Sequence, residues 1–214
     1  MHGRILAVLG GTDLGDDELI KWVNSADEIW AADSGADRLF RLGLPCHSVI
    51  GDMDSISKEA AQHYPNHHLD CDQESTDCDK LLARAHLLGV HRLTLINVEG
   101  DRMDHVLSTL NSAAGSPIQV QLALRGALGT IVFPGDHTFE TEAKAIVSLI
   151  PLQPSSEVVF SGVAWPLDGQ TLQLGQRISV SNVALSDSIR LGFKSGVCLL
   201  YRAFSSNNLP KWPS

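Results

Sequence analysis

From its start to about residue 114, the chain alternates short apolar runs with amphipathic stretches. The apolar runs have the length and composition of buried strands, and the stretches between them carry apolar residues at helical spacing. We expect strands at "RILAVLG", "EIWAAD", "SVIGD", "HHLDCD" and "RLTLINVEG", and helices over residues 16–24, 36–42, 56–64, 76–89 and 103–114. This regular succession predicts an α/β domain with a mostly parallel sheet and helices on both faces.

After "NSAAGSPIQ" the pattern changes to short strand-like pieces separated by turn residues. The expected strands are "VQLAL", "GTIVF", "AIVSLIPL", "EVVFSGV", "TLQLGQRISVS", "SIRLGF" and "GVCLLYR", with turns at "PGD", "PLQPSS" and "PLDGQ". Closely spaced short strands are typical of an all-β sandwich or a partly closed barrel. We therefore predict two domains, an α/β domain over residues 1–126 and a β-sandwich domain over residues 127–214.

The balance of charge limits the kinds of partner. The 214 residues carry a formal charge of -9, which is the wrong sign for binding nucleic acid or an anionic membrane. A metal cation or a cationic ligand is the better match. No stretch approaches the roughly 20 apolar residues of a membrane span, and we expect a cytoplasmic protein. The four cysteines form no C-x-x-C pair, which favours free thiols.

Aspartates gather where the expected strands end. Each of four loops that follow strands contributes acidic or basic residues: Asp33; Asp52 and Asp54; Asp70 and Asp72; Asp101, Arg102 and Asp104. In an open α/β sheet, ligands bind at the carboxyl ends of the strands, where these loops converge. Loops are polar in any protein, so a single aspartate there means little. The joint pattern predicts a binding site.

Asp52 and Asp54 stand two residues apart in "SVIGDMDSIS". In an extended segment, residues at this spacing point the same way. Two adjacent carboxylates repel each other unless a cation lies between them, and Mg²⁺ prefers oxygen ligands together with substrate phosphates. We expect these two residues to hold Mg²⁺.

The segment "QESTDCDKLL" predicts the start of a helix. Thr76 and Asp79 have the spacing of a capping box, which accounts for Thr76 without any catalytic role. It does not account for Asp77, which we expect in the first helical turn, as a further metal ligand or as a group that accepts a proton.

The segment "EGDRMDHVL" offers a group that binds phosphate. Arg102 presents a planar fork of donors, and Asp104 and His105 begin the next helix. An Arg102–Asp104 ion pair that only fixes the loop is the alternative. The chain has neither a G-x-x-x-x-G-K-[ST] nor a G-x-G-x-x-G motif, so metal, arginine and helix N-termini must hold any nucleotide.

With these residues in place, the chain resembles the thiamine pyrophosphokinase family. Its members carry, in order, elements that match "ADSGAD", "GDMDS", "QESTD" and "GDRMDH", and later "GVAWPL" and "VSN". The resemblance runs over almost the whole chain. It implies an α/β catalytic domain, a β-sandwich domain, and a homodimer with active sites at the subunit interface. It also implies Mg²⁺-dependent transfer of pyrophosphate from ATP to the hydroxyethyl group of thiamine.

The resemblance assigns roles to particular residues. It places Asp52, Asp54 and Asp77 at the metal and phosphate site. Nucleotide and substrate contacts fall to Gln73, Thr76, Arg102 and Asp104, with Asp33 and His105 beside them. Trp165, Ser181 and Asn182 occupy the positions of the thiamine pocket; a tryptophan of the sandwich core is the alternative for Trp165.

Three positions depart from the family pattern: Met53, Glu74 and Asp101. Asp101, beside Arg102, introduces a carboxylate that can pair with the arginine or weaken ATP binding. Two other functions therefore stay open. One is pyrophosphoryl transfer to another primary alcohol, such as a hydroxymethyl pterin. The other is a thiamine- or nucleotide-binding regulator without turnover.

Overall fold

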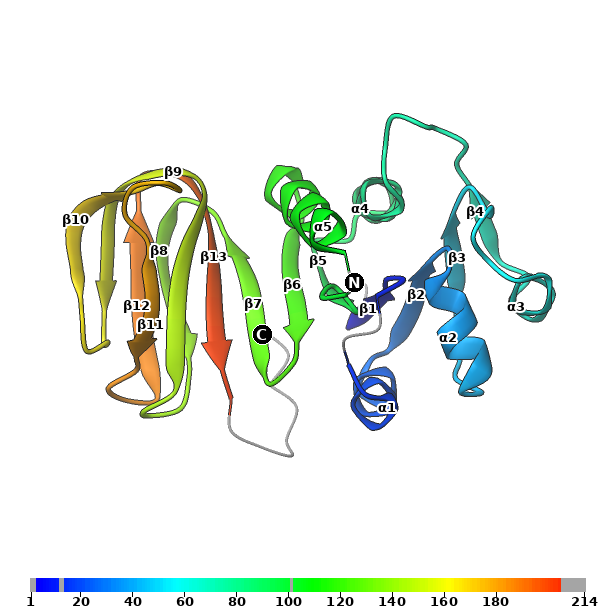
Figure 1. Ribbon diagram of the computed structural model, residues 1–214, viewed down its shortest axis with the longest axis horizontal. Coiled ribbons are helices and arrows are strands. Elements are labelled where there is room, and N and C mark those ends of the chain that lie inside the picture. The colour runs from blue at the N-terminus through cyan, green and yellow to red at the C-terminus, as the bar shows by residue number, and fades with distance from the viewer. Residues whose placement is uncertain (1–2, 12–13, 101, 205–214) are drawn as a thin grey trace. The chain divides into compact units, whose positions relative to one another are not determined.

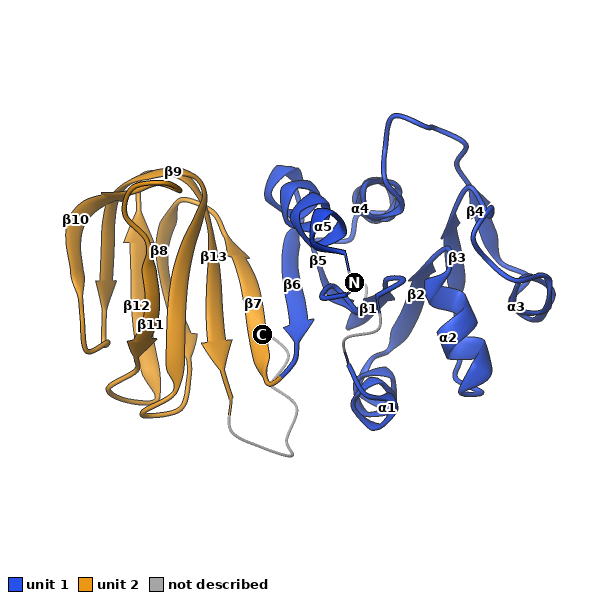
Figure 2. Cartoon of the chain, in the orientation of Figure 1, with its two compact units in different colours: residues 1–125, 211–214 blue, residues 126–210 orange. Residues whose placement is uncertain are grey.

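The structure is a computed structural model that describes residues 3–11, 14–100 and 102–204. The described chain divides into two compact units, shown in Figure 2. Unit 1 runs to Arg125, and unit 2 begins at Gly126.

Unit 1 contains a parallel sheet in the strand order β4-β3-β2-β1-β5-β6. In register, Leu6 of β1 lies opposite Ile29 of β2 on one side and Thr94 of β5 on the other. The prediction of a mostly parallel sheet is confirmed. The strands are β1 (Ile5–Val8), β2 (Glu28–Ala32), β3 (Ser48–Gly51), β4 (His67–Leu69), β5 (Arg92–Ile96) and β6 (Gln119–Leu124).

Five helices connect these strands and cover both faces of the sheet (Figure 1). Right-handed crossovers place the helices that lead towards β4 on one face and those that lead back towards β6 on the other. The buried Leu39 of α2 and Leu81 of α4 belong to the resulting core. The helices are α1 (Asp16–Ser25), α2 (Gly35–Arg41), α3 (Lys58–His63), α4 (Asp77–Leu87) and α5 (Met103–Gly115).

The strand order reverses direction between β1 and β5. From β1 the chain builds outwards to β4, and then it returns to lay β5 on the other side of β1. At such a point the loops that leave two adjacent strands diverge to opposite faces and open a crevice at the carboxyl ends of the strands. The loops after β1, β2, β3 and β5 all begin at this edge.

Unit 2 is built around the long strand β9. The first half of β9 pairs with β13 and β11, and its second half pairs with β12 and β10. Strand β7 pairs with β13, and β8 pairs with β12. The strands are β7 (Ala127–Val132), β8 (Gly135–Glu140), β9 (Ile146–Ser161), β10 (Leu167–Leu172), β11 (Ser179–Val183), β12 (Ser188–Phe193) and β13 (Ser195–Ala203).

One hydrophobic core lies between these two sets of strands. It contains Leu149 and Phe160 from the two halves of β9, Leu191 from β12 and Leu200 from β13, all fully or almost fully buried. Because residues from both sets share one core, the sandwich interpretation is confirmed.

Four details of unit 2 differ from expectation. The runs "AIVSLIPL" and "EVVFSGV" are one strand, because β9 continues through Pro151 and Pro154 with shifts of register against β13. The run "TLQLGQRISVS" is divided between β10 and β11 by a turn in which the N–H of Gln173 donates to the carbonyl of Arg177. Strand β8 begins within the expected turn "PGD" and is an additional strand. Strand β10 begins at Leu167, within the expected turn "PLDGQ".

In the part of the chain that the structure describes, no helix combines the length and apolar character needed to cross a membrane.

Candidate functional site

Three carboxylates converge at the carboxyl edge of the unit 1 sheet. Asp33 follows β2, and Asp52 and Asp54 follow β3. One oxygen from each of the three lies within 4.8 Å of the others. Acids from two of the four expected loops therefore meet in this cluster.

The backbone brings Asp52 and Asp54 together by a turn. Strand β3 ends at Gly51, and Met53 has a φ of 65°, so the segment is not extended as the sequence reasoning assumed. The N–H of Asp54 donates to Oδ1 of Asp52 at 3.2 Å. This hydrogen bond is the leading cause that lowers the pKa of Asp52, which keeps that carboxylate charged.

Asp33 is fully buried and incompletely paired. Its Oδ2 accepts a hydrogen bond from the N–H of Ser55 at 3.0 Å, whereas Oδ1 has no partner among the described residues. Burial raises the pKa of Asp33 to about 6; the Ser55 bond opposes the change and the nearby acids Asp77, Asp52 and Asp54 add to it. A buried carboxylate oxygen without a donor is a position where a cation would be favourable.

Asp77 stands next to Asp33 at the start of α4. A side chain on Gly51 would place its Cβ 3.1 Å from the Cβ of Asp33 and 3.2 Å from Oδ1 of Asp77. A larger residue would have to displace these acids by a few tenths of an ångström and adopt the φ of 155° that Gly51 has. Burial is the main cause that raises the pKa of Asp77, and the charge of Lys80 partly offsets it.

The predicted capping box at the start of α4 is confirmed. The N–H of Asp79 donates to Oγ1 of Thr76, and the N–H of Thr76 donates to Oδ2 of Asp79 at 2.9 Å. These bonds fix the first turn of the helix, which carries Asp77.

Lys80 is a site residue that the sequence reasoning missed. Its side chain is 3% exposed, and its Nζ lies 3.5 Å from Oδ2 of Asp52 and 3.6 Å from Oδ1 of Asp77. Burial disfavours the ammonium form, but the two carboxylates outweigh this and raise the pKa of Lys80. The available signal was its place one turn after Asp77 on the same helix, where i and i+3 side chains are neighbours.

The remaining nucleotide candidates surround this cluster. Nε2 of Gln73 donates to Oδ2 of Asp52 at 3.3 Å. Arg102 and Asp104 form the ion pair that was the alternative to phosphate binding, with 2.6 Å between Nη2 and Oδ2, and both are well exposed. An exposed pair of this kind contributes little stability, so Arg102 is available to a stronger anion. Asp101 lies outside the described residues, and its effect on Arg102 stays a prediction.

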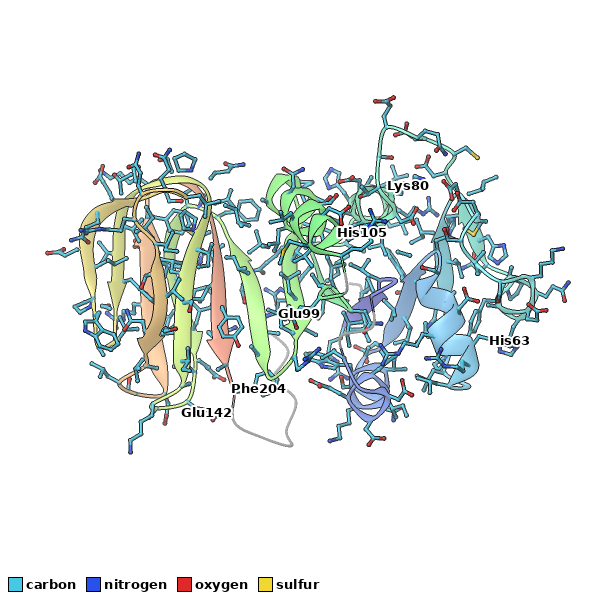
Figure 3. The ribbon with its side chains drawn as sticks, viewed as in Figure 1. His63, Lys80, Glu99, His105, Glu142 and Phe204 are labelled. Atoms are coloured by element: carbon cyan, nitrogen blue, oxygen red, sulfur yellow. The ribbon has the colours of Figure 1, made fainter. Side chains whose placement is uncertain are left out.

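A cavity of about 610 Å³ opens beside the acids. Lys80 and His105, labelled in Figure 3, come from the neighbouring helices α4 and α5 and both line it. Asp52, Asp77 and Asp104 contribute further walls, together with Gln73, Thr76 and Asp72. Asp70 is not among the lining residues. The volume is large enough for a nucleotide-sized ligand.

A second cavity of about 300 Å³ lies where the sheet changes direction. The loops after β1 and β5 line it through Gly10, Gly11, Val98 and Gly100, and Arg102 and His105 close it. A Cβ on Gly11 would lie 2.2 Å from the carbonyl oxygen of Asn97, so only glycine allows these loops to approach. The two cavities share Leu9, Gly10, Ser34, His105 and Thr109.

The three expected thiamine residues lie in unit 2. Asn182 is 2% exposed; its Oδ1 accepts from the N–H of Trp165 at 3.0 Å, and its Nδ2 donates to the carbonyl of Trp165 at 2.7 Å. Ser181 has a φ of 57°, and its N–H donates to Oγ of Ser148. The side chain of Trp165 is 65% exposed, so the alternative of a sandwich-core tryptophan is wrong.

The acidic cluster fits a divalent cation. The donors are carboxylate oxygens from two loops, and the Oδ1 atom of Asp33 lacks any hydrogen-bond donor among the described residues. Oxygen donors of this type suit Mg²⁺ better than Zn²⁺, which takes nitrogen and sulfur ligands more often.

Two family models match the sequence. "Thiamin pyrophosphokinase, catalytic domain" matches residues 19–122, within unit 1, and "Thiamin pyrophosphokinase, vitamin B1 binding domain" matches residues 136–198, within unit 2. Together these segments span well over half of the chain.

Similar proteins and structures agree with the family models. A thiamine pyrophosphokinase of Bacillus subtilis is 23% identical over 186 residues, covering 82% of this chain and 87% of its own length. Thiamine pyrophosphokinase 1 of rice, Oryza sativa subsp. japonica, is 26% identical over 193 residues, covering 75% of this chain and 73% of its own.

Among solved structures, the crystal structure of the thiamine pyrophosphokinase from Bacillus subtilis has a TM-score of 0.80 at 22% identity. It covers 94% of this chain and 98% of its own. At this identity the likeness demonstrates the shared fold. The two family models match in order, one in each unit, and the fold is shared with solved thiamine pyrophosphokinase structures. The chain therefore belongs to the thiamin pyrophosphokinase family.

Proposed function

We propose that this protein transfers the pyrophosphoryl group of ATP to the hydroxyethyl oxygen of thiamine, giving thiamine diphosphate and AMP. The bond between the α-phosphate bridging oxygen and the β-phosphorus breaks, a bond from the thiamine oxygen to that phosphorus forms, and the hydroxyl proton is released. Such a reaction depends on positioning and on neutralising charge more than on a covalent intermediate.

The observation that carries the proposal is the cluster of Asp33, Asp52 and Asp54. Their oxygens lie within 4.8 Å of one another, and Asp52 lines the 610 Å³ cavity, in a chain of this family. Asp52 and Asp54 are our principal Mg²⁺ ligands, and the unpartnered Oδ1 of Asp33 adds a third candidate. Asp77, which we also expected as a ligand, lies beside Asp33 over Gly51. A bound Mg²⁺ would neutralise charge on the phosphates.

The other residues of unit 1 have positioning roles in this proposal. Asp77 orients the thiamine hydroxyl or accepts its proton; its raised pKa makes it a better base than an ordinary carboxylate. Arg102 stabilises charge on the phosphates, for which its planar fork of donors is suited. The nucleotide contacts fall to Asp33, Gln73, Thr76, Asp104 and His105.

In unit 2, Trp165 is our candidate for contact with the cationic thiamine ring. An exposed indole face attracts a cation by about 0.5–2 kcal/mol. Asn182 holds the backbone of Trp165 through two hydrogen bonds, and Ser181 precedes Asn182 in the left-handed conformation. This arrangement supports a rigid platform for the indole.

The proposal extends to assembly and location. We propose a homodimer in which the acids of one chain and the Trp165 region of the other build each active site. A cytoplasmic location fits the ATP donor and the four free cysteines.

The test is to incubate the protein with ATP, Mg²⁺ and thiamine and to measure AMP and thiamine diphosphate. A hydroxymethyl pterin assayed in parallel addresses the alternative acceptor, and the comparisons do not favour that acceptor. Equimolar AMP and thiamine diphosphate are expected, with no pterin product. Tight binding of thiamine or ATP with no AMP formed would contradict the enzymatic proposal and favour a regulator.

A further inference from the structure

Lys80 is the charged side chain of the site to which the roles above assign no task. It is 3% exposed, and it precedes the fully buried Leu81 and the almost fully buried Leu82 on α4. Burying an ammonium group is unfavourable unless strong partners replace its water. Because Lys80 is buried nevertheless, the strength of its contacts indicates whether it has another anionic partner.

The two partners of Lys80 hold it only weakly. Nζ lies 3.5 Å from Asp52 and 3.6 Å from Asp77, whereas a well-formed ammonium–carboxylate hydrogen bond is about 2.7–2.9 Å. An ammonium also has three protons to donate. Among the described residues, Lys80 thus has capacity for a closer anionic partner.

The side chain of Lys80 also lies at a cavity that could hold an anionic ligand. Lys80, labelled in Figure 3, lines the 610 Å³ cavity. Asp52, Asp77 and Thr76 line it as well. Apart from Lys80 and its neighbour His105, the charged residues that line this cavity are acidic: Asp52, Asp72, Asp77 and Asp104. A polyphosphate that enters a space with these acids needs cationic contacts from the protein as well as metal.

We propose that Lys80 is a catalytic residue whose ammonium binds an oxygen of the transferred β- and γ-phosphates. It leaves its weak contacts with Asp52 and Asp77 for a direct contact with the donor. This inference rests on the proposed function, because it takes ATP as the donor. It differs from a purely structural role, in which Lys80 only holds Asp52 and Asp77 in position for the metal.

The two roles predict opposite effects on metal binding. If Lys80 only positions Asp52 and Asp77, Lys80→Met disorders the acids, and metal and polyphosphate binding weaken together. If Lys80 binds the phosphates, the variant loses polyphosphate affinity, while metal binding stays equal or becomes tighter, since one positive charge near the cation is gone.

The experiment measures three ligands on Lys80→Met and the parent protein. Calorimetry in Mg²⁺ gives the affinities for inorganic tripolyphosphate and for AMP, and electron paramagnetic resonance gives the affinity for Mn²⁺ alone. We expect tripolyphosphate affinity to fall about 10-fold or more, AMP affinity to change less than about 3-fold, and Mn²⁺ affinity not to fall. Lys80→Arg should recover part of the tripolyphosphate affinity.

Lys58→Met, on the exposed surface of α3, is the matched control and should leave all three affinities unchanged. Unchanged tripolyphosphate binding in Lys80→Met, or parallel losses of tripolyphosphate and Mn²⁺, would overturn the inference. If Lys80→Met lacks a cooperative unfolding transition, Lys80→Gln is measured in its place against the same expectations. Product formation by the parent protein tests the proposed function separately from these affinities.

Discussion

Asp33 is a buried carboxyl group whose ionisation the folded state resists. Its pKa is raised to about 6, against about 3.9 for an unfolded chain. Between these values the folded protein keeps a proton that the unfolded protein has lost. The free energy of unfolding therefore falls as pH rises from about 4 to about 6, and the loss persists at neutral pH.

We predict that Asp33→Asn stabilises the metal-free protein at neutral pH. The asparagine oxygen can still accept the Ser55 hydrogen bond, and asparagine tolerates the positive φ of 38°. The free energy of unfolding in urea and chelator should rise by about 1–3 kcal/mol at pH 7.5 and hardly change at pH 4. Asp17→Asn, on the exposed surface of α1, is the control. An equal effect at both pH values would show that ionisation of Asp33 is not the cause.

Replacing Trp165 by alanine tests whether this residue contacts thiamine, the proposed acceptor. Because its side chain is 65% exposed, Trp165→Ala should change the free energy of unfolding by less than about 1 kcal/mol. Loss of a stacking contact should raise the KM for thiamine about 10-fold, and the KM for ATP should stay near that of the parent. Steady-state kinetics with each substrate varied in turn provides the measurement. An unchanged thiamine KM in a stable variant would remove Trp165 from the pocket.

At the scale of elements, Asn182 connects β11 to the segment that carries Trp165. Its Oδ1 accepts from the N–H groups of Trp165 and Val183, and its Nδ2 donates to the carbonyl of Trp165. In Asn182→Ala these backbone groups lose their partner. We predict a loss of about 2–3 kcal/mol in the free energy of unfolding together with a higher thiamine KM.

This combined effect differs from that of Trp165→Ala, which should leave stability intact. Urea unfolding and thiamine kinetics on both variants separate a supporting residue from a contacting one. If Asn182→Ala raised the thiamine KM without any loss of stability, Asn182 would be a direct ligand and not the support of the loop.

The elements of unit 1 were predictable because their signals are local. The expected helix over 103–114 is observed as Met103–Gly115, and the expected capping box fixes the start of α4. In unit 2, the sequence predicted a turn at Pro151 and Pro154, where β9 in fact continues. Proline usually interrupts a regular strand, but β9 has register shifts against β13 that accommodate both prolines.

The site was predictable where a strand end or a helix start marked it. Asp33, Asp52 and Asp54 follow strands, and the rule that ligands bind at the carboxyl ends of strands in open α/β sheets predicts that they meet. The turn at Met53 and the burial of Lys80 were not predictable in the same way. The first depends on a positive φ at a residue that rarely adopts one, and the second on the packing of α4 against the sheet.

At the scale of the whole molecule, the proposed homodimer makes a prediction about shared active sites. Asp54 is in unit 1 and Trp165 is in unit 2. If each site takes its acids from one chain and its Trp165 from the other, a dimer of one Asp54→Asn chain and one Trp165→Ala chain has one site with both defects. Its other site has neither defect.

Such a mixed dimer, co-expressed with two tags and purified through both, should show about half of the parent activity per dimer at low thiamine concentration. Each homodimeric variant should be far less active under the same conditions, because every site carries one defect. A dimer of one parent chain and one Asp54→Asn chain is the control and should also show about half. Light scattering must give the mass of two chains.

Two outcomes would contradict the shared site. If the activity of the mixed dimer is no higher than the mean of the two homodimeric variants, each chain builds its own site. A monomeric mass with full turnover would exclude the dimer altogether.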